Sequence, residues 1–476
     1  MMKKNVIIWV WIGVVVFMGA CKPQKQNVEW IESTEPAPWV VRDSLFAEKS
    51  GNPISGEMAV VFTDSTLQVI QGFGACFNEL GWDALSLLSN NDRAAVMSEL
   101  FEPGKGGNFT LCRMPVGAND FSRDWYSYDE TNDDFEMTHF SIANDTNTLI
   151  PFILNAKKYN PDLKIWASPW SPPLWMKHNR HYACRPLPGI NDLPGDPNTN
   201  LEGTNMFITR PEYYQAYALY FGKFIDAYKT AGIDIFAVAP QNEFNSCQCF
   251  PSCTWLSSAL ADFVGNYLGP EMQKREVQVM FGTMERPDAR MADTVLQHPR
   301  AGKYISIAGF QWAGKEAIAA VHNKYPQLTL YQTEQECGDG KNTWSAAIYS
   351  WNLMKHYLSN GANVYEYWNL ALKEGGKSRW GWKQNSLVVV DTLTQKYHYT
   401  PEYHVFKHIT NKVQPGAKRL QTSGYEDLLA FKNPDGSVVI VTGNFDNTDK
   451  PITIRVNDKQ ICPVLTAGSL NTLVIK

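Results

Sequence analysis

The stretch Ile235-Phe-Ala-Val-Ala-Pro-Gln-Asn-Glu-Phe244 is an apolar run that stops on an Asn-Glu pair. A continuous apolar run is typical of a parallel strand whose two faces are both covered. Pro240 cannot donate to a sheet ladder, so it predicts the end of the strand and places Asn242 and Glu243 at or just beyond its carboxyl end. In barrels of alternating strands and helices, the functional side chains lie at that end.

A second run of the same kind, Leu328-Thr-Leu-Tyr-Gln-Thr-Glu334, also ends on a carboxylate. Double-displacement hydrolysis of a glycoside requires two carboxyl groups, one as proton donor and one as nucleophile. Glu243 and Glu334, each at the end of a predicted strand, therefore form a candidate catalytic pair.

The spacing of the other strand candidates predicts a barrel. Helix-length amphipathic segments separate most of them, and one of these segments, 211–229, has Pro in its first turn and Gly232 just past its end. The strand candidates lie at residues 69–74, 109–114, 164–167, 235–239, 277–281, 305–310, 328–333 and 364–368. This series of strand-helix units predicts an α/β fold, a (β/α)8 TIM barrel over residues 69–405.

The C-terminal part of the chain has a different pattern. Short β-branched segments alternate with turn residues there, and Asn433-Pro-Asp-Gly436 is a strong hairpin turn. Residues 406–476 are therefore predicted to form a small antiparallel β-sandwich. Residues 28–68 precede the barrel, and we expect them to supply N-terminal strands to the same sandwich.

The N-terminus has the pattern of an export signal. A basic head and an apolar run at 6–18 precede Met18-Gly-Ala-Cys21. The Gly-Ala-Cys ending resembles the lipobox of bacterial lipoproteins, which implies lipidation of Cys21. We predict a lipoprotein signal peptide over 1–21, a tether over 22–27, and an exported protein that is lipid-anchored in the bacterial envelope, at the outer membrane, the cell surface or the periplasmic face. A plain N-terminal anchor helix is the alternative, and it also places the body of the protein outside the cytoplasm.

Composition narrows the range of partners. The formal net charge is −5 and the chain has no long basic run, which argues against nucleic acid as a partner. Aromatic residues make up 13% of the chain, and their faces can stack on the apolar face of a sugar, although most Trp in any chain are core residues. This composition suits a sugar as the partner, and we expect a monomer.

Cysteines cluster after Glu243, at Cys247, Cys249 and Cys253, and two more follow other predicted strands, Cys184 and Cys337. In an oxidising compartment one or two loop disulfides among them are expected. The alternative is that the clustered cysteines bind a metal ion, but no His lies within the cluster. We predict no metal site and no organic cofactor.

A series of motifs in chain order carries a family resemblance. The motifs are Gln71-Gly-Phe-Gly74, Arg113-Met-Pro-Val-Gly-Ala-Asn-Asp-Phe-Ser122, Ala167-Ser-Pro-Trp-Ser-Pro-Pro-Leu-Trp-Met-Lys177, Gln241-Asn-Glu243, Thr333-Glu334 and Tyr367-Trp-Asn-Leu-Ala-Leu372. The series resembles that of glycoside hydrolase family 30, the family of lysosomal glucosylceramidase, and most of all its bacterial members that include β-1,6-glucanases. The resemblance covers nearly the whole mature chain, including the C-terminal part.

The resemblance implies roles for individual residues. Glu243 matches the general acid/base, Glu334 the nucleophile and Asn242 the partner of the sugar 2-hydroxyl. Substrate-binding positions are matched by Asp120, Trp170, Trp368, Trp312 and Arg113. Arg113, expected at the floor of the barrel, would lower the pKa of Glu334, whereas Glu243 must hold a proton, and in a retaining enzyme the two carboxyl groups stand about 5 to 5.5 Å apart.

Simpler interpretations remain open for several of these residues. Glu336 lies two positions after Glu334, so the period of a strand could place both on one face and make Glu336 the nucleophile. Arg113 could be a structural ion-pair partner, Trp170 and Trp368 could be core residues, and Asp120 could cap a loop.

The chain departs from the family pattern beside the expected aglycone site. Phe310-Gln-Trp-Ala313 stands where glucosylceramidases have a His-Trp-Tyr sequence, and the loop Asn245-Ser-Cys-Gln-Cys-Phe-Pro-Ser-Cys253 is unusual. We therefore predict a retaining β-glycoside hydrolase that acts on β-1,6-glucan or its oligosaccharides. The alternatives are a glucosylceramidase, a β-xylosidase or β-fucosidase, and a surface glycan-binding lipoprotein without turnover.

Overall fold

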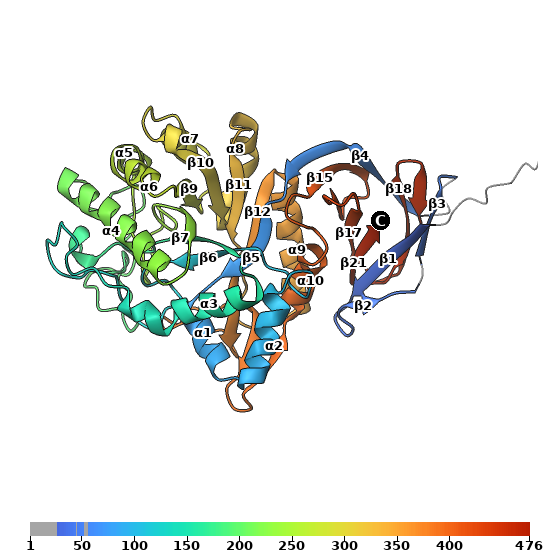
Figure 1. Cartoon of the computed structure of the whole chain (residues 1–476), viewed down its shortest axis with the longest axis horizontal. Coiled ribbons are helices and arrows are strands. Elements are labelled where there is room, and N and C mark those ends of the chain that lie inside the picture. Colours follow the sequence, from blue (N-terminus) through green and yellow to red (C-terminus); the bar gives the residue numbers. More distant parts are fainter. Residues whose placement is uncertain (1–25, 44, 52–55) are drawn as a thin grey trace, which may run out of the picture.

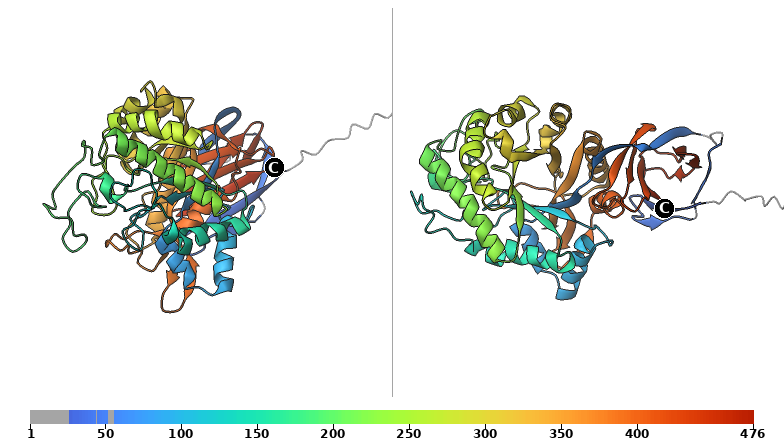
Figure 2. Two further views of the ribbon diagram at one scale, coloured as in Figure 1. Left: turned by 60° about the vertical axis from the view of Figure 1, so that its left-hand side comes forward. Right: turned by 45° about the horizontal axis from the view of Figure 1, so that its top comes forward.

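The computed structural model describes residues 26–43, 45–51 and 56–476, which form a barrel and an adjoining β-sandwich (Figures 1 and 2). The barrel consists of eight parallel strands, and it closes because β12 pairs with β5 on one side and with β11 on the other. In order these strands are β5 (Gly72–Cys76), β6 (Leu111–Pro115), β7 (Lys164–Ser168), β8 (Ile235–Val238), β9 (Gln278–Met284), β10 (Ile305–Gln311), β11 (Thr329–Glu334) and β12 (Ala362–Lys373). The predicted fold class is confirmed.

Helices follow the strands and cover the outside of the barrel. They are α1 (Glu79–Ser86), α2 (Asn90–Phe101), α3 (Leu149–Tyr159), α4 (Pro211–Thr230), α5 (Ser257–Phe263), α6 (Gly269–Gln273), α7 (Arg290–Leu296), α8 (Ile318–Lys324), α9 (Trp344–Ser359) and α10 (Pro401–Thr410). The α4 helix begins at the Pro that the sequence predicted, because Pro lacks only an N–H that the first turn leaves unpaired anyway. None of the helices in the described part of the chain is long and apolar enough to cross a membrane.

Close strand packing explains the Gly-rich motif at the start of the barrel. A Cβ atom on Gly74 would lie 1.8 Å from the carbonyl oxygen of Leu111 on the neighbouring strand, so only Gly fits there. The barrel interior is filled near the amino ends of its strands by an apolar cluster that includes Leu111, Trp166, Tyr331 and Val364. The polar side chains of the predicted catalytic pair lie beyond this apolar cluster, at the carboxyl ends of the strands.

The sandwich is one rolled sheet formed by both ends of the chain. Its strands are β1 (Gln26–Ser33), β2 (Val40–Val41), β3 (Leu45–Lys49), β4 (Glu57–Val69), β15 (Lys418–Gly424), β16 (Leu428–Lys432), β17 (Val438–Asn444), β18 (Lys450–Val456), β19 (Lys459–Ile461), β20 (Val464–Leu465) and β21 (Ser469–Ile475). The sheet closes on itself because β19 pairs with both β3 and β18, and it encloses its own hydrophobic core. Neighbouring strands are antiparallel except for β4 and β18, which run parallel.

The segment boundaries differ from the predicted ones in two places. Strand β1 begins at Gln26, inside the expected tether 22–27, because its backbone pairs with β3 and β21. The expected boundary after residue 405 falls inside α10, which packs against both α9 and the sandwich strands β1 and β21. A hairpin that the sequence did not predict, β13 (Ser386–Asp391) and β14 (Lys396–Tyr399), continues the barrel sheet beyond β12.

Candidate active site

Glu243 stands on a tight turn beyond the carboxyl end of β8. Its φ angle is +46°, a left-handed conformation that non-Gly residues rarely adopt, and such strained residues are concentrated at functional sites. Two contacts hold the turn: the N–H of Asn242 donates to the carbonyl oxygen of Pro169 (2.6 Å), and the N–H of Glu243 donates to Thr283 Oγ1 (3.0 Å). The end of the strand and the neighbouring strand β9 together fix the direction of the Glu243 side chain.

Glu334 is the last residue of β11, and three donors surround its carboxylate. Arg113 Nη1 lies 3.0 Å from Oε2, Gln311 Nε2 lies 3.1 Å from the same oxygen, and Trp312 Nε1 lies 2.9 Å from Oε1. The side chain is 5% exposed. A buried carboxylate with this set of donors is stabilised in its ionised form.

The amide of Gln311 joins the two carboxyl groups. Its Nε2 atom lies 3.0 Å from Glu243 Oε1 and 3.1 Å from Glu334 Oε2, so these two oxygens are no more than about 6 Å apart. Retaining glycosidases hold their carboxyl groups about 5 to 5.5 Å apart, and inverting enzymes about 6.5 to 9.5 Å apart. The spacing of Glu243 and Glu334 therefore fits a retaining pair.

Arg113 lies at the floor of the cleft and is fully buried. Besides Glu334, its guanidinium donates to Ser168 Oγ (2.9 Å) and to Asn242 Oδ1 (2.6 Å). Its Cζ atom also lies over the rings of Trp166, Trp170 and Trp368, at 4.9, 4.4 and 5.5 Å from their centroids. This one cation connects Glu334, Asn242 and the aromatic wall of the cleft.

Burial and local contacts act on both carboxyl groups. Burial raises the pKa of Glu334 and that of Glu243, and Arg113 acts against burial at Glu334. Arg113 and Trp312 contact Glu334 alone, whereas Glu243 accepts from Gln311 and Ser246. Glu334 is therefore the better position for the negative charge, and the proton of a singly protonated pair belongs on Glu243.

Asn242 is oriented by the groups around its carbonyl oxygen. Oδ1 accepts from Arg113, from Thr283 Oγ1 (3.0 Å) and from Gln311 Nε2 (3.2 Å). Its Nδ2 has no hydrogen-bond partner among residues 26–43, 45–51 and 56–476. Asn242 is thus held next to Glu243, and its contact with the 2-hydroxyl of a sugar stays a prediction.

Three of the other predicted binding residues, Asp120, Trp170 and Trp312, line one cleft together with both carboxyl groups. The cleft has a volume of about 280 Å³. Asp120 is buried, and its Oδ1 atom has no hydrogen-bond partner in the described part of the chain. Burial and the charges of Glu334 and Glu243 raise its pKa well above its usual range. A buried acceptor without a partner at the wall of a cleft fits a ligand hydroxyl.

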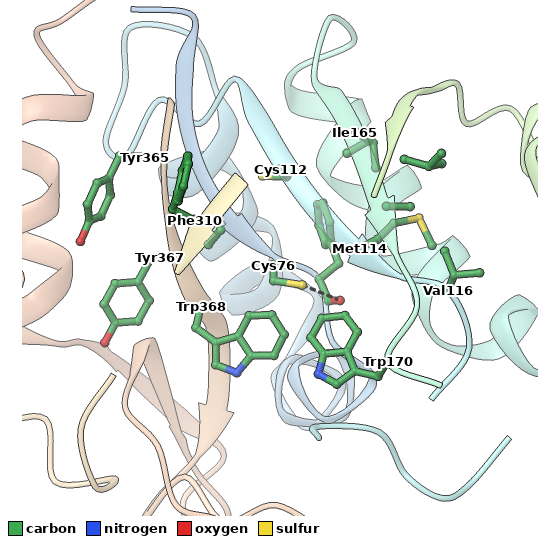
Figure 3. Packing of buried hydrophobic residues seen from close by; sticks show 14 of the residues in the cluster. Cys76, Cys112, Met114, Val116, Ile165, Trp170, Phe310, Tyr365, Tyr367 and Trp368 are labelled. Carbon is green, nitrogen blue, oxygen red and sulfur yellow. Dashed lines mark hydrogen bonds between the residues drawn. The ribbon is translucent and has the colours of Figure 1, made fainter. Parts of the chain in front are cut away.

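Trp170 and Trp368 pack against each other beneath the cleft, with ring centroids 5.4 Å apart (Figure 3). Trp368 comes from β12 and points to the opposite side of that strand from Tyr365 and Tyr367, as Figure 3 shows. Of the two indoles, Trp170 lines the cleft, whereas Trp368 lies behind it and is fully buried. Trp368 thus shapes the pocket by packing on Trp170 and Arg113.

Glu336, the rival of Glu334, is separated from Glu243. Its carboxylate pairs with Lys315 Nζ (2.6 Å) and accepts from Tyr349 (2.7 Å), and it lines a neighbouring cavity rather than the cleft. Trp312 forms the wall between the two spaces, and its own φ angle is +49°. The geometry therefore pairs Glu243 with Glu334.

Several residues of the site were missed from the sequence. Gln311 occurred only as a departure from the family pattern, although its position at the end of β10 could have indicated a role. Thr283, at the end of β9, contacts both Asn242 and Glu243. Glu285 and Arg286 follow on the same side, line the cleft and form an ion pair at 3.0 Å, and Arg286 also pairs with Glu202.

The loop cysteines do not form the expected disulfides. The eight cysteines in the described part of the chain are free thiols, and two of them point at carbonyl oxygens: Cys184 Sγ lies 3.3 Å from Ser252 O, and Cys247 Sγ lies 3.8 Å from Thr199 O. Within residues 26–43, 45–51 and 56–476, no group of three or more His, Cys, Asp and Glu side chains is arranged to hold a metal. Cys21 lies outside the described residues.

Family models match both parts of the chain. The model described as the glycosyl hydrolase family 30 TIM-barrel domain matches residues 70–413, and the one described as the glycosyl hydrolase family 30 beta sandwich domain matches residues 416–473. The split between the two lies just after α10.

Known relatives carry two kinds of name. Lysosomal acid glucosylceramidase of Mus musculus is 26% identical over 89% of this chain and 84% of its own length. Putative glucosylceramidase 2 of Caenorhabditis elegans is 28% identical over 88% of this chain and 82% of its own length. An endo-1,6-beta-D-glucanase of Trichoderma harzianum is 26% identical over 88% of this chain and 87% of its own length.

Solved structures share the fold. SrfJ from Salmonella typhimurium superposes with a TM-score of 0.84 at 24% identity, over 95% of this chain and all of its own. An endo-beta1,6-glucanase superposes with a TM-score of 0.79 at 23% identity, over 94% of this chain and 99% of its own.

Proposed function

The chain belongs to glycoside hydrolase family 30, and from this premise we propose that it is a retaining enzyme that cleaves β-glucosidic bonds, with Glu334 as nucleophile and Glu243 as general acid/base. That it is a glycoside hydrolase follows from the family. The observation that carries the assignment of roles is the asymmetric set of contacts around the pair. Gln311 contacts both carboxyl groups, but only Glu334 also accepts from Arg113 and Trp312.

The reaction proceeds in two displacements. Glu334 attacks the anomeric carbon while Glu243 gives its proton to the departing glycosidic oxygen, which leaves a glycosyl-enzyme ester and an ionised Glu243. Glu243 then takes a proton from water, the resulting hydroxide attacks the anomeric carbon, and Glu334 leaves as a carboxylate. The anomeric configuration is retained because it is inverted twice.

The surroundings of the pair support both steps. Arg113 stabilises the carboxylate of Glu334 whenever it is free, and Nδ2 of Asn242 is available to the 2-hydroxyl of the sugar. Asp120 and the face of Trp170 supply an acceptor and a stacking surface on the wall of the cleft. A sugar ring in contact with Trp170 would bury apolar C–H groups while its hydroxyls reach polar partners.

For the substrate we favour β-1,6-linked glucan or its oligosaccharides over glucosylceramide. The outer part of the cleft is lined by polar side chains, among them Gln248, Glu285, Arg286 and Gln384, together with the aromatic rings of Phe250 and Trp382. Such a mixture suits further sugar units better than the two hydrocarbon chains of a ceramide. The glucosylceramidase and the glucanase relatives have similar sequence identity to this chain, so our choice of substrate rests on the residues that line the cleft.

The pattern at residues 1–21 supports export of the enzyme and a lipid anchor at Cys21 in the bacterial envelope. An anchored enzyme would meet polysaccharide outside the cytoplasm. Incorporation of labelled palmitate into the wild-type protein but not into Cys21→Ala, followed by cell fractionation, tests this part of the proposal. Release of an unlabelled, soluble wild-type protein would contradict the anchor.

Substrate assays with the form that begins at Lys22 test the main proposal. Linear β-1,6-glucan and glucosylceramide are incubated separately, and products are followed by chromatography over time, with Glu334→Gln as the inactive control. A ladder of oligosaccharides from the glucan would indicate endo action, and glucose alone would indicate exo action. Release of ceramide with the glucan untouched would overturn the substrate but keep the mechanism, whereas binding without turnover of any β-glycoside would indicate a glycan-binding protein.

A further inference from the structure

Another cavity, separate from the cleft and from the cavity lined by Glu336, lies at the junction of barrel and sandwich, near the amino ends of the barrel strands. It has a volume of about 390 Å³, and its polar lining comes from Gln68, His322, Ser359, Asn363 and Arg419. Asn363 stands at the amino end of β12, whereas Glu334 lies at the carboxyl end of the neighbouring strand β11. In Figure 1 the strands β4 and β15 arch over this junction next to α9. The cavity shares no lining residue with the cleft.

Arg419 is the unusual member of this lining because it is a buried cation without an anion. Arg419 is only 9% exposed, and its Nε atom is buried and has no hydrogen-bond partner in the described part of the chain. Its single hydrogen bond within the described chain runs from Nη2 to Ser359 Oγ, at 3.3 Å. No carboxylate of residues 26–43, 45–51 and 56–476 forms an ion pair with it, and burial lowers its pKa.

The sheet directs this side chain away from the sandwich core. Leu420, the next residue along β15, is fully buried in that core, so Arg419 projects from the opposite face of the strand. The pairing of β15 with β4 shifts register between Lys418 and Leu420, an irregularity of the kind that re-aims a side chain. Arg419 thus projects toward the C-terminal end of α9, where Ser359 lies.

The neighbours of Arg419 are neutral and do not replace a counter-ion. The end of α9 carries a partial charge of roughly −0.5. However, the amide of Gln68 already donates to one carbonyl oxygen there, that of Leu358 (2.6 Å), and it also donates to that of Ala362 at the start of β12 (3.1 Å). A guanidinium carries a full positive charge and several N–H donors, and a buried charge without a partner is costly.

We propose that this cavity binds a small oxyanion, a phosphate, a sulfate or a carboxylate, with Arg419 as its main ligand. The planar fork of a guanidinium matches the oxygens of such groups. The hydroxyl of Ser359 accepts from Arg419 and keeps its own hydrogen free, so it supplies a second donor at the mouth of the cavity. The amide of Gln68 donates to the carbonyl oxygens of Leu358 and Ala362, and that of Asn363 donates to the carbonyl oxygen of Val69, so Arg419 and Ser359 are the donors that remain for the anion. The cavity has room for a group attached to it.

Thermal melting of the full chain in different salts tests the site. Inorganic phosphate, inorganic sulfate and sodium glucuronate are each compared with chloride at one ionic strength, in wild type, Arg419→Met and Arg290→Met. Phosphate and sulfate stabilise folded proteins in general, so the difference between wild type and Arg419→Met is the readout. Arg290, which is highly exposed and paired with Asp288, is the matched control for removal of a surface cation.

Saturating anion is expected to raise the Tm of wild type and of Arg290→Met by roughly 2 to 5 °C more than that of Arg419→Met. The salt that gives the largest rise in the Tm of wild type shows which ligand binds better, a tetrahedral anion (phosphate or sulfate) or a carboxylate (glucuronate). Equal rises in wild type and Arg419→Met would overturn the proposal. If Arg419→Met does not fold, Ser359→Phe, a change at the exposed end of α9 that blocks the mouth of the cavity, must abolish calorimetric binding of the same anions, and undiminished binding would overturn the proposal equally.

Discussion

Two buried arginines lie at opposite ends of the barrel strands, and their surroundings differ. Arg113, at the carboxyl ends, donates to Glu334, Ser168 and Asn242 and lies over several indole rings. Arg419, at the junction with the sandwich, has one weak hydrogen bond and no carboxylate among the described residues. The first arginine organises a site that is complete within the chain, whereas the second lacks its anion. The role of a buried arginine can therefore be inferred mainly from the anion that compensates its charge.

The largest effect should come from the anion that balances Arg113. Glu334→Gln keeps the shape of the side chain but removes the nucleophile, so kcat should fall by roughly 10⁴ to 10⁶-fold. Binding of the sugar product, measured by calorimetry, should be retained. The control is Glu336→Gln, which breaks contacts with Lys315 and Tyr349 in the neighbouring cavity and should leave kcat within about tenfold of wild type. The opposite ranking of the two variants would make Glu336 the nucleophile.

Arg113→Met should damage both stability and activity. The change leaves Glu334 buried without its cation, and loss of one partner of a buried ion pair costs about 3 to 5 kcal/mol. The variant should melt well below wild type at pH 7 and should also lose most of its activity, because the pKa of Glu334 rises when Arg113 no longer lowers it. A variant that melts like wild type would show that Arg113 does not stabilise the site.

Gln311→Leu should alter the pH profile more than the fold. The active form needs an ionised Glu334 and a protonated Glu243, so activity should fall on the acid side as Glu334 gains a proton and on the alkaline side as Glu243 loses one. Burial raises both pKa values, and the hydrogen bond from Gln311 lowers that of Glu243. Without this bond the alkaline limb should move upward by about 0.5 to 1 pH unit.

The pH profile of kcat/KM checks this expectation, with Gln248→Leu, which removes an amide from the outer cleft, as the control for loss of a polar group. A downward shift of the alkaline limb in Gln311→Leu, or the same shift in both variants, would contradict the assignment of the proton to Glu243.

Arg419→Met should have the smallest effect and the opposite sign to Arg113→Met. Replacement of an unpaired buried charge by an apolar side chain of similar length is often neutral or stabilising. In chloride, without an added oxyanion, the variant should melt within about 1 °C of wild type or above it, with kcat unchanged. A loss of stability as large as that of Arg113→Met would mean that Arg419 is already balanced within the chain.

The barrel and its catalytic pair were accessible from the sequence because their signals are local. Buried strands read as apolar runs, Pro240 marked the end of one of them, and Glu334 is the last residue of another. The sandwich strands at the N-terminal side were harder to place individually, since β1 does not alternate between buried and exposed positions and one of its partners, β21, is far away in the sequence.

Residues whose roles depend on register were not predicted. Gln311 reaches both carboxyl groups because the pairing of β10 with β11 shifts between Phe310 and Gln311. Thr283 likewise contacts Glu243 on the turn beyond β8, and Arg419 contacts Ser359 at the end of α9. The loop disulfides were wrongly predicted because the spacing of cysteines in the sequence does not fix the direction of each thiol. In the structure Cys184 and Cys247 face carbonyl oxygens.

The anomeric configuration of the first product tests the central claim most directly. Proton NMR of a β-glucoside digest, recorded before mutarotation, reports whether β-glucose or α-glucose appears first. Double displacement by Glu334 and Glu243, whose bridged oxygens are no more than about 6 Å apart, predicts the β-anomer. Initial formation of the α-anomer would contradict the covalent intermediate and with it the role of Glu334.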